Sequence, residues 1–283
     1  MPNCKICSLY SGSRGNSTFI SAGGANILID AGKSAKALCC ALSGIGVSIE
    51  SIDAIFITHE HSDHVSALRT LSHKHNIPIH ILLRSAEIFR GLCDERLCSS
   101  LQMYGGGSFE TTVKGLKVKA FPTPHDSNAA VGYRISFEED GREIALGVST
   151  DTGHVTDTML ENLSGCYAVV IEANHDPEML ENGPYPYDLK QRISGNRGHL
   201  SNSDCAALAS RLYEGGTRNI MLAHLSEENN LPSLAYNEVF TAIANPCVNL
   251  KVARQDEAVW LTDGEAEEDR LSQEELLWLR SDS

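Results

Sequence analysis

Short apolar runs recur along the chain, separated by turns rich in glycine and acidic residues, and each run has the length of a β-strand. The pattern predicts strands over residues 5–10, 17–21, 26–29, 54–58, 79–83, 116–122, 131–138, 143–149, 168–172 and 219–223. Apolar residues at helical spacing predict helices over residues 33–43, 65–75, 85–93, 155–163, 202–214 and 233–244. Clustered strands with interspersed helices, in two comparable halves, predict an α/β fold in which two packed sheets carry helices on their outer faces.

With 283 residues and no linker rich in Pro, Gly or Ser, the chain is expected to form one domain over residues 1–262. An acidic helical tail follows over 263–283, with leucines that could give it a docking face. Residues from Asp256 onward carry ten acidic and two basic side chains, more than half of the net charge of −14. Such an acidic balance argues against broad, nonspecific coating of nucleic acid.

The cellular compartment is inferred from what the sequence lacks. No run of about 18 apolar residues exists, so we expect no membrane span. The N-terminus begins at once with strand-like sequence and has no signal-peptide pattern. The Cys4–Cys7 pair has no second pair at zinc-ribbon spacing, which favours buried reduced thiols. These features predict a cytoplasmic protein.

The segment Thr58-His-Glu-His-Ser-Asp-His64 places three histidines and one aspartate within six residues, directly after an apolar run. Neutral imidazole and carboxylate are ligands that zinc, manganese and iron accept. Because alternate residues of a strand face the same way, His59 and His61 can share one metal ion. After a turn, Asp63 and His64 would open a helix and face a second metal ion.

Further polar residues stand where other predicted strands end, which is where sites form in α/β folds. They are His125, Asp151, Glu172, His175 and His224. One histidine at a strand end is usually a structural residue. Several such ends, in a chain that already holds a ligand cluster, favour a shared metal site.

The chain resembles the metallo-β-lactamase fold superfamily, because HEHSDH matches its HxHxDH signature and later ligand motifs follow in order. The resemblance spans roughly residues 4 to 255 and implies an αββα sandwich of two mixed sheets with a two-metal site. Carried over residue by residue, it assigns His59, His61 and His125 to one metal ion. The second metal ion would be held by Asp63, His64 and His224, with Asp151 bridging both. The identity of the two divalent ions (Zn, Mn or Fe) stays open.

The expected chemistry follows from charge. Two divalent ions lower the pKa of a bridging water towards about 7, which provides a hydroxide nucleophile. Asp63 lies close enough to orient that water or accept its proton. Glu172 and His199 are the candidates for delivering a proton to the leaving group, since an imidazolium held by a carboxylate is a competent general acid.

Substrate class varies widely within the superfamily. Here IEANHD, GHLS (198–201) and LAHLS (222–226) resemble segments of its tRNA-maturing phosphodiesterases. LYSGSRGNST (9–18), FPTPHDSNAAVGYRI (121–135), VSTDTGH (148–154) and LAHLSEENN (222–230) resemble its bacterial YycJ/WalJ branch of metal-dependent 5′ exonucleases. The resemblance implies a 5′-to-3′ DNA exonuclease with DNA as its partner, and no flavin or nucleotide cofactor.

Candidate substrate-binding residues are Arg14 and Asn16 in the glycine-rich segment 11–16, Arg197 in the insertion over 185–197, and Ser226. Segment 11–16 also fits a tight turn, and the insertion, which carries Lys190 and Arg192, also fits an ordinary exposed loop. Three alternatives remain: RNA as the nuclease substrate, a small ester or thioester as the substrate, and a scaffold with a structural metal site.

Overall fold

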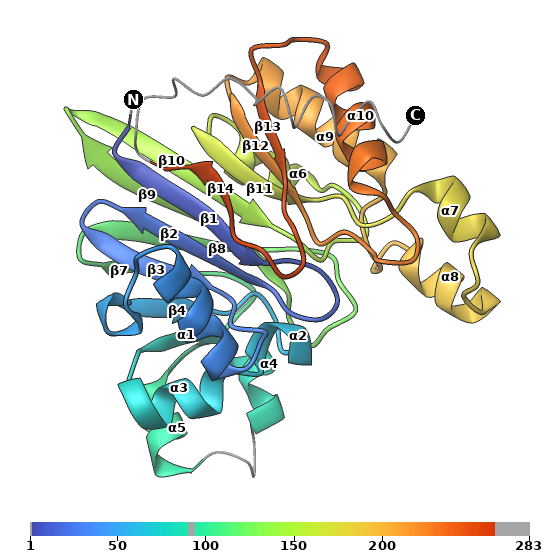
Figure 1. Cartoon of the computed structure of the whole chain (residues 1–283). Coiled ribbons are helices and arrows are strands. Elements are labelled where there is room, and N and C mark those ends of the chain that lie inside the picture. The colour runs from blue at the N-terminus through green and yellow to red at the C-terminus, as the bar shows by residue number, and fades with distance from the viewer. Residues whose placement is uncertain (1, 90–93, 264–283) are drawn as a thin grey trace.

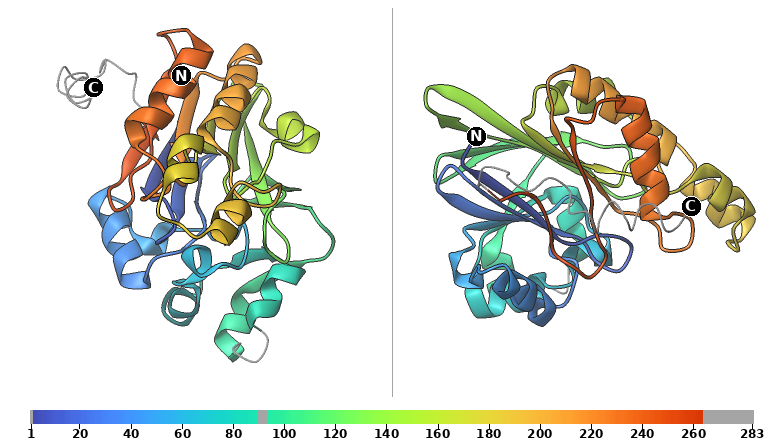
Figure 2. Two further views of the ribbon diagram at one scale, coloured as in Figure 1. Left: turned by 90° about the vertical axis from the view of Figure 1, so that its right-hand side faces the viewer. Right: turned by 45° about the horizontal axis from the view of Figure 1, so that its top comes forward.

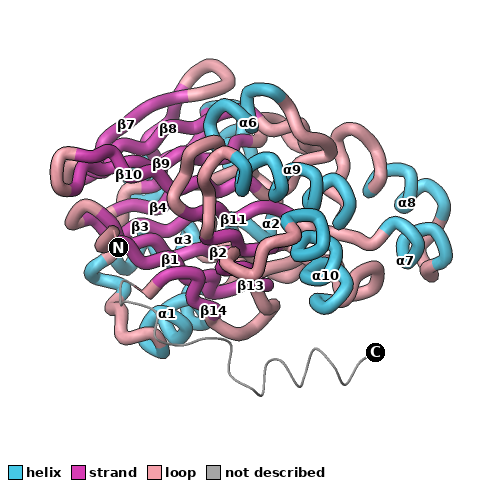
Figure 3. Tube along the Cα trace, turned by 90° about the horizontal axis from the view of Figure 1, so that it is seen from above, coloured by secondary structure: helices cyan, strands magenta, loops and turns pink. Residues whose placement is uncertain are grey.

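The computed structural model describes residues 2–89 and 94–263. These residues form two seven-stranded sheets packed face to face. Helices cover the outer face of each sheet, as the views from the side and from above show (Figures 1, 2 and 3). The predicted αββα sandwich is therefore confirmed.

The first sheet has the strand order β14-β1-β2-β3-β4-β5-β6. Its strands are β1 (Cys4–Tyr10), β2 (Ser17–Ala22), β3 (Ala25–Ile29), β4 (Ala54–Phe56), β5 (Ile79–Leu82), β6 (Leu101–Tyr104) and β14 (Val259–Thr262). From β14 to β3 the neighbours run antiparallel, and from β3 to β6 they run parallel. β14 thus returns from the far end of the described chain to pair with β1.

The second sheet has the order β13-β12-β11-β10-β9-β8-β7. Its strands are β7 (Phe109–Val113), β8 (Leu116–Pro122), β9 (Val131–Glu139), β10 (Arg142–Ser149), β11 (Ala168–Glu172), β12 (Asn219–Ala223) and β13 (Asn249–Val252). β7 to β10 pair antiparallel and β10 to β13 pair parallel. The two sheets therefore share one plan, in which three antiparallel pairings are followed by three parallel ones.

Helices lie on both outer faces, and two of them protrude. Near the first sheet are α1 (Ala35–Gly44), α2 (Ser62–Val65), α3 (Leu68–His75), α4 (Leu83–Ala86), α5 (Glu95–Ser100) and the 3₁₀ turns Ile49–Ser51 and Glu87–Phe89. The second sheet carries α6 (Asp157–Leu163), α9 (Asn202–Glu214) and α10 (Pro232–Ile243). α7 (Pro177–Asn182) and α8 (Tyr187–Ile193) project from the end of the sandwich opposite the N-terminus (Figure 1). None of the described helices has both the length and the apolar character that crossing a bilayer requires.

The apolar core has three layers, as burial by two stacked sheets requires. The middle layer lies between the sheets and contains Ile6, Ile20, Tyr133, Val170 and Met221. A second layer packs the first sheet against α1 and α3, and a third packs the other sheet against α6, α9 and α10. The thiols of Cys4 and Cys7 are free and buried, and burial raises their pKa to about 11 and about 12.

The apolar pattern located the long elements best. β8, β11, β12 and α9 have the predicted bounds, while the helix expected over 65–75 divides into α2 and α3. Within the helix expected over 85–93, the described part holds the end of α4 and a 3₁₀ turn. The pattern missed β6, β7, β13, β14, α5, α7 and α8, which are short and mostly carry half-buried or exposed residues. The helix predicted over 263–283 lies outside the described residues apart from Asp263, so the boundary at 262 stays a prediction.

Candidate active site

Loops from both sheets meet at one end of the sandwich. β3 and β4 of the first sheet end there, as do β8, β10, β11 and β12 of the second. Three residues that lie within two positions of a strand end adopt left-handed backbone conformations: Asp30 (φ 64°), Asp151 (φ 56°) and His224 (φ 59°). Such conformations are uncommon outside glycine and concentrate at functional sites. Each of these turns directs a polar side chain towards the same centre.

The first predicted ligand group lies together. His59 Nε2 is 2.9 Å from His61 Nδ1, and the ring of His125 lies 4.9 Å from that of His59, centroid to centroid. One nitrogen from each of the three rings can be chosen so that all lie within 4.8 Å of one another. His125 Nδ1 is 3.0 Å from the backbone oxygen of Gly198, to which it donates, so Nε2 is the nitrogen that faces the group.

The second predicted group is equally compact. Asp63 Oδ2 lies 3.3 Å from His64 Nε2 and 3.7 Å from His224 Nε2. α2 begins at Ser62, directly after His61 of the first group. This short helix therefore directs Asp63 and His64 towards the position predicted for the second metal ion. The three side chains again supply ligand atoms within 4.8 Å of one another.

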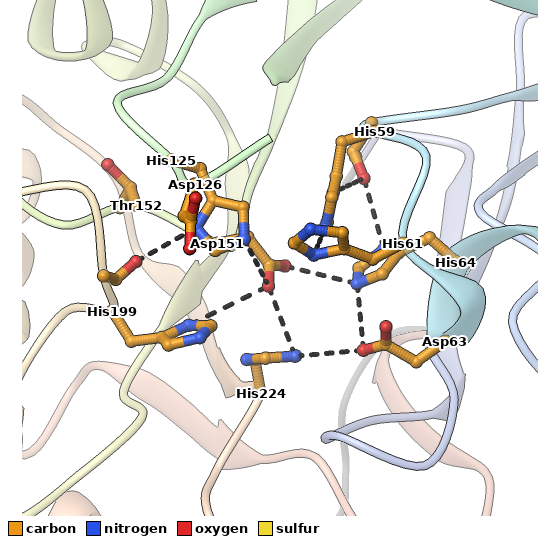
Figure 4. Close-up of polar contacts among 12 residues, drawn as sticks. His59, His61, Asp63, His64, His125, Asp126, Asp151, Thr152, His199 and His224 are labelled. Carbon is orange, nitrogen blue, oxygen red and sulfur yellow. Dashed lines mark hydrogen bonds and ion pairs between the residues drawn. The ribbon is translucent and has the colours of Figure 1, made fainter. Parts of the chain in front are cut away.

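Asp151 lies between the two groups (Figure 4). Its Oδ2 is 3.5 Å from His64 Nε2, and its Oδ1 is 3.4 Å from His224 Nε2 and 3.9 Å from His125 Nε2. Three buried atoms at this centre have no hydrogen-bond partner among the described residues: His125 Nε2, Asp151 Oδ2 and His224 Nε2. Buried polar atoms are seldom left unpaired, and nitrogen and carboxylate donors fit divalent cations. The residues present therefore fit a divalent metal centre.

Glu172 and His199 meet beside this centre. His199 Nδ1 is 2.7 Å from Glu172 Oε1, and His224 Nδ1 is 3.1 Å from the same oxygen. Glu172 Oε2 accepts the backbone N–H groups of Thr152 and Leu200. Burial alone would raise the pKa of Glu172, but its contacts with the imidazoles of His199 and His224 hold it at about 2. The ionised carboxylate is saturated by donors, so it orients two imidazoles and is poorly placed to be a metal ligand itself.

A second layer of hydrogen bonds orients the ligands. Asp30 Oδ2 is 2.8 Å from His64 Nδ1, and Asp30 also accepts the backbone N–H and the hydroxyl of Thr58. This arrangement leaves His64 Nε2 facing the metal position. Ser11 Oγ accepts the backbone N–H of His224 at 2.7 Å, which holds the left-handed turn at that residue.

The predicted substrate-binding residues occupy different surroundings. Asn16 is buried and contacts ligands, with Nδ2 3.2 Å from Asp63 Oδ2 and 3.1 Å from His64 Nε2. Arg14 pairs with Glu227 on the surface. Ser226 lines the cavity at the metal centre, and its Oγ accepts the backbone N–H of Asn229. Substrate contact by these residues stays a prediction.

The insertion between β11 and α9 forms one wall of that cavity, which has a volume of about 280 Å³. Of its cations, Lys190 donates to the backbone oxygen of Glu181 and Arg192 pairs with Asp126 at 2.6 Å. Arg197 donates to the backbone oxygens of His125 and Ser127. The segment is thus anchored to the loop that carries His125.

Sequence reasoning did not anticipate three supporting residues. Glu60 lies between His59 and His61 in the sequence, and its side chain is buried. Its Oε1 accepts the backbone N–H of Asn128 on the loop that carries His125. Asn174 Nδ2 donates to the backbone oxygen of His224. Tyr185 lines the cavity from the insertion. The only signal for them was position, because each lies within three residues of a predicted site residue or inside the insertion.

The fold and the site define the class of protein. Residues 25–225 match the family described as the beta-lactamase superfamily domain. The metallo-beta-lactamase fold protein YhfI from Bacillus subtilis has a similar structure, with a TM-score of 0.67 and 17% sequence identity, covering 91% of this chain and 99% of that one. The chain belongs to the metallo-β-lactamase superfamily.

Within the superfamily the similarity is to a particular branch. The chain is 34% identical over 227 residues to exodeoxyribonuclease YycJ of Bacillus anthracis, covering 80% of this chain and 84% of that protein. It is also 34% identical over 244 residues to exodeoxyribonuclease WalJ of Streptococcus pneumoniae, covering 85% and 88% of the two chains. The chain therefore belongs to the YycJ/WalJ family, as its motifs predicted.

Proposed function

We propose that the protein is a dinuclear metal-dependent phosphodiesterase that removes nucleotides from DNA in the 5′-to-3′ direction. The observation that carries the proposal is the convergence of the seven predicted ligands from both sheets on one centre with unpaired buried donor atoms. The choice of DNA is supported by the two similar proteins, which are named exodeoxyribonucleases. Zinc, manganese and iron all suit this donor set.

In this mechanism His59, His61 and His125 would hold one cation, and Asp63, His64 and His224 would hold the other, with Asp151 available to both groups. Two bound cations supply Lewis acidity, which lowers the pKa of water and stabilises charge on a phosphoryl oxygen. Asp63 Oδ2 faces the imidazoles of His64 and His224, which places it to orient the attacking water and accept its proton.

The leaving oxygen needs a proton, and His199 is placed to supply it. Its Nδ1–H donates to Glu172 Oε1, so Nε2 is the nitrogen that can carry the transferable proton. The ring lines the cavity and is partly exposed, whereas Glu172 is fully buried. Glu172 thus fixes the orientation of the ring and leaves Nε2 facing the cavity.

The direct test uses duplex DNA labelled at the 3′ end, with 5′-phosphate or 5′-hydroxyl termini, and added manganese or zinc. We expect mononucleotide release from the 5′ end. The ligand variants His61→Ala and Asp63→Ala should lose at least about 100-fold in rate, since even partners of metal ligands are worth 10- to 100-fold. His73→Ala is the matched control, because His73 pairs with Asp94 on the surface.

Metal content is measured on the same samples. A wild-type protein that carries metal yet releases nothing from DNA would reject the proposal. Hydrolysis of RNA, of bis-p-nitrophenyl phosphate only, or of small thioesters would identify which other substrate class the site serves. A loaded protein that is inert on every substrate would indicate a scaffold.

A further inference from the structure

Three cavities meet at the metal centre. The central one, of about 280 Å³, shares Ser226 with a cavity of about 700 Å³ beside β13 and β14. It shares His125 and Arg197 with a third cavity, of about 620 Å³, between α4 and the loops after β6 and β8. A polynucleotide extends beyond the phosphodiester that is cut, so its chain must leave the centre through a neighbouring cavity. The chemistry of the two side cavities differs.

The 620 Å³ cavity is cationic. Arg84 and Arg197 line it, and no aspartate or glutamate belongs to its described lining. Arg84 is exposed, and its guanidinium has neither a hydrogen bond nor an ion pair with any residue in the described part of the chain. Arg197 is held in place by the backbone oxygens of His125 and Ser127. One guanidinium is therefore free to bind a phosphate, and the other is fixed at the junction with the metal centre.

The same cavity has further groups suited to a nucleotide chain. Thr123 lines it, is only 7% exposed, and has a hydroxyl without a hydrogen-bond partner among the residues described. The backbone of Gly105–Gly107 forms one edge, and a Cβ at any of these positions would meet no atom within 4 Å. Leu83, which is 49% exposed, adds an apolar surface for a sugar or base. A guanidinium that can donate to phosphate, a buried hydroxyl and an apolar edge thus lie together.

The 700 Å³ cavity suits a polyanion less well, because its two cations, Lys251 and Arg254, are balanced by two carboxylates, Glu227 and Glu257. Its Arg254 is paired with Glu257, and Glu227 at its wall takes Arg14 and Gln255 as partners. Carboxylates at the wall repel phosphate, and an arginine that is already paired must break its contact to bind one.

We infer that the 620 Å³ cavity holds the DNA strand on one side of the phosphodiester that is cut, with Arg84 contacting a backbone phosphate there. The inference rests on the proposed function and adds a path for the strand. Arg84 is a binding residue in this account, because it lies outside the metal centre. Loss of a single phosphate contact weakens binding of all sequences and lowers the salt dependence of binding.

The test compares Arg84→Ala, Arg84→Lys and, as the matched control in the other cavity, Arg254→Ala. KM and kcat are measured on 5′-phosphorylated DNA and on bis-p-nitrophenyl phosphate. This small diester is too short to extend from the metal centre into either side cavity. Binding of the oligonucleotide is also measured by fluorescence anisotropy in the inactive Asp63→Ala background, at several salt concentrations. This second readout does not depend on turnover.

For Arg84→Ala we expect the DNA Kd and KM to rise about 10-fold and the log–log salt slope to fall by about 1. Hydrolysis of the small diester should not change, and Arg84→Lys should recover part of the binding. An unchanged Kd and salt slope in Arg84→Ala would overturn the inference, and a loss in Arg254→Ala alone would assign the strand to the other cavity. If wild-type protein hydrolyses the small diester but neither binds nor cuts DNA, the proposed function itself fails.

Discussion

The carboxylate of Glu172 contacts two imidazole rings with different surroundings. His224 is buried and turns Nε2 towards the metal ligands, while His199 is 22% exposed at the cavity. The same oxygen therefore supports one ring as a candidate ligand and the other as a candidate acid. This difference in exposure, which the sequence does not display, is what separates the two roles.

Replacing His199 with alanine should slow DNA hydrolysis by about 10²- to 10³-fold, because an alkoxide leaving group needs a proton. Cleavage of bis-p-nitrophenyl phosphate should fall less than about 10-fold, since p-nitrophenolate leaves without one. Steady-state kinetics on both substrates, with metal analysis of each sample, check the expectation. Glu172→Gln should slow the hydrolysis of both substrates and also lower metal content, because it weakens the contact that orients His224 as well as the one that orients His199. Equal losses on both substrates in His199→Ala would show that the ring is not the acid.

Site residues were predictable from the sequence wherever a histidine or aspartate, both common metal ligands, stands at the end of a predicted strand. The HEHSDH segment and the residues at 125, 151 and 224 follow apolar runs, so their convergence could be expected. The contacts of Asn16 could not, because its side chain reaches Asp63 and His64 across 47 and 48 positions of sequence. Such long-range contacts depend on how strands are paired, and local pattern does not fix that pairing.

Three backbone segments interlock behind the second ligand group. Asn16 N donates to Asp63 O, Gly32 N donates to Asn16 O, and Ala31 N donates to His64 O. The turn after β3 and the start of α2 therefore touch without side chains between them. A Cβ placed on Gly32 would lie 1.5 Å from Asp63 O and 2.3 Å from Asp63 C. The absence of a side chain at Gly32 is what lets the two elements approach.

Gly32→Ala should accordingly destabilise the protein by about 3 kcal/mol or more, the upper range for overpacking. It should also lower metal content, because Asp63 must move. Gly44→Ala is the matched control: Gly44 ends α1, a Cβ there meets no atom within 4 Å, and alanine in a helix is favoured by about 0.5–1 kcal/mol. Urea unfolding of both variants measures the two changes. Equal stability of the two variants would contradict the packing argument.

Element prediction succeeded for long, strongly apolar segments such as β11, which is buried along its whole length. It failed for β14, whose four residues are mostly half-buried and pair with β1 from more than 250 positions away. It also predicted no helix in the insertion over 185–197, where α8 forms. α8 has no buried residue and therefore gives no amphipathic signal.

The whole molecule consists of two similar half-structures joined face to face. Each sheet has three antiparallel pairings followed by three parallel ones, and the apolar layer between the sheets joins them. The halves differ in what they bring to the centre. The first supplies His59, His61, Asp63 and His64 from one junction, and the second supplies His125, Asp151 and His224 from three. Bound metal ions would therefore cross-link the halves.

Removal of metal should lower the stability of the entire fold for that reason. A ligand that binds only the folded state at 1,000 times its Kd adds about 4 kcal/mol. We expect chelation to lower the midpoint of thermal unfolding of wild-type protein, and re-addition of zinc or manganese to restore it. Because ligands must lose protons to bind metal, this stabilisation should shrink as the pH falls from about 7.5 to about 5.5.

Differential scanning calorimetry with and without chelator, repeated across that pH range, measures the effect. His61→Ala should show a smaller difference between metal-loaded and metal-free samples, since it removes one ligand of the first group. His73→Ala should behave like wild type, because His73 pairs with Asp94 away from the centre. A midpoint that does not change when metal is removed, in protein shown to have carried it, would mean that the two halves hold together by their apolar interface alone. In that case the ligand cluster would serve the reaction without contributing to the stability of the fold.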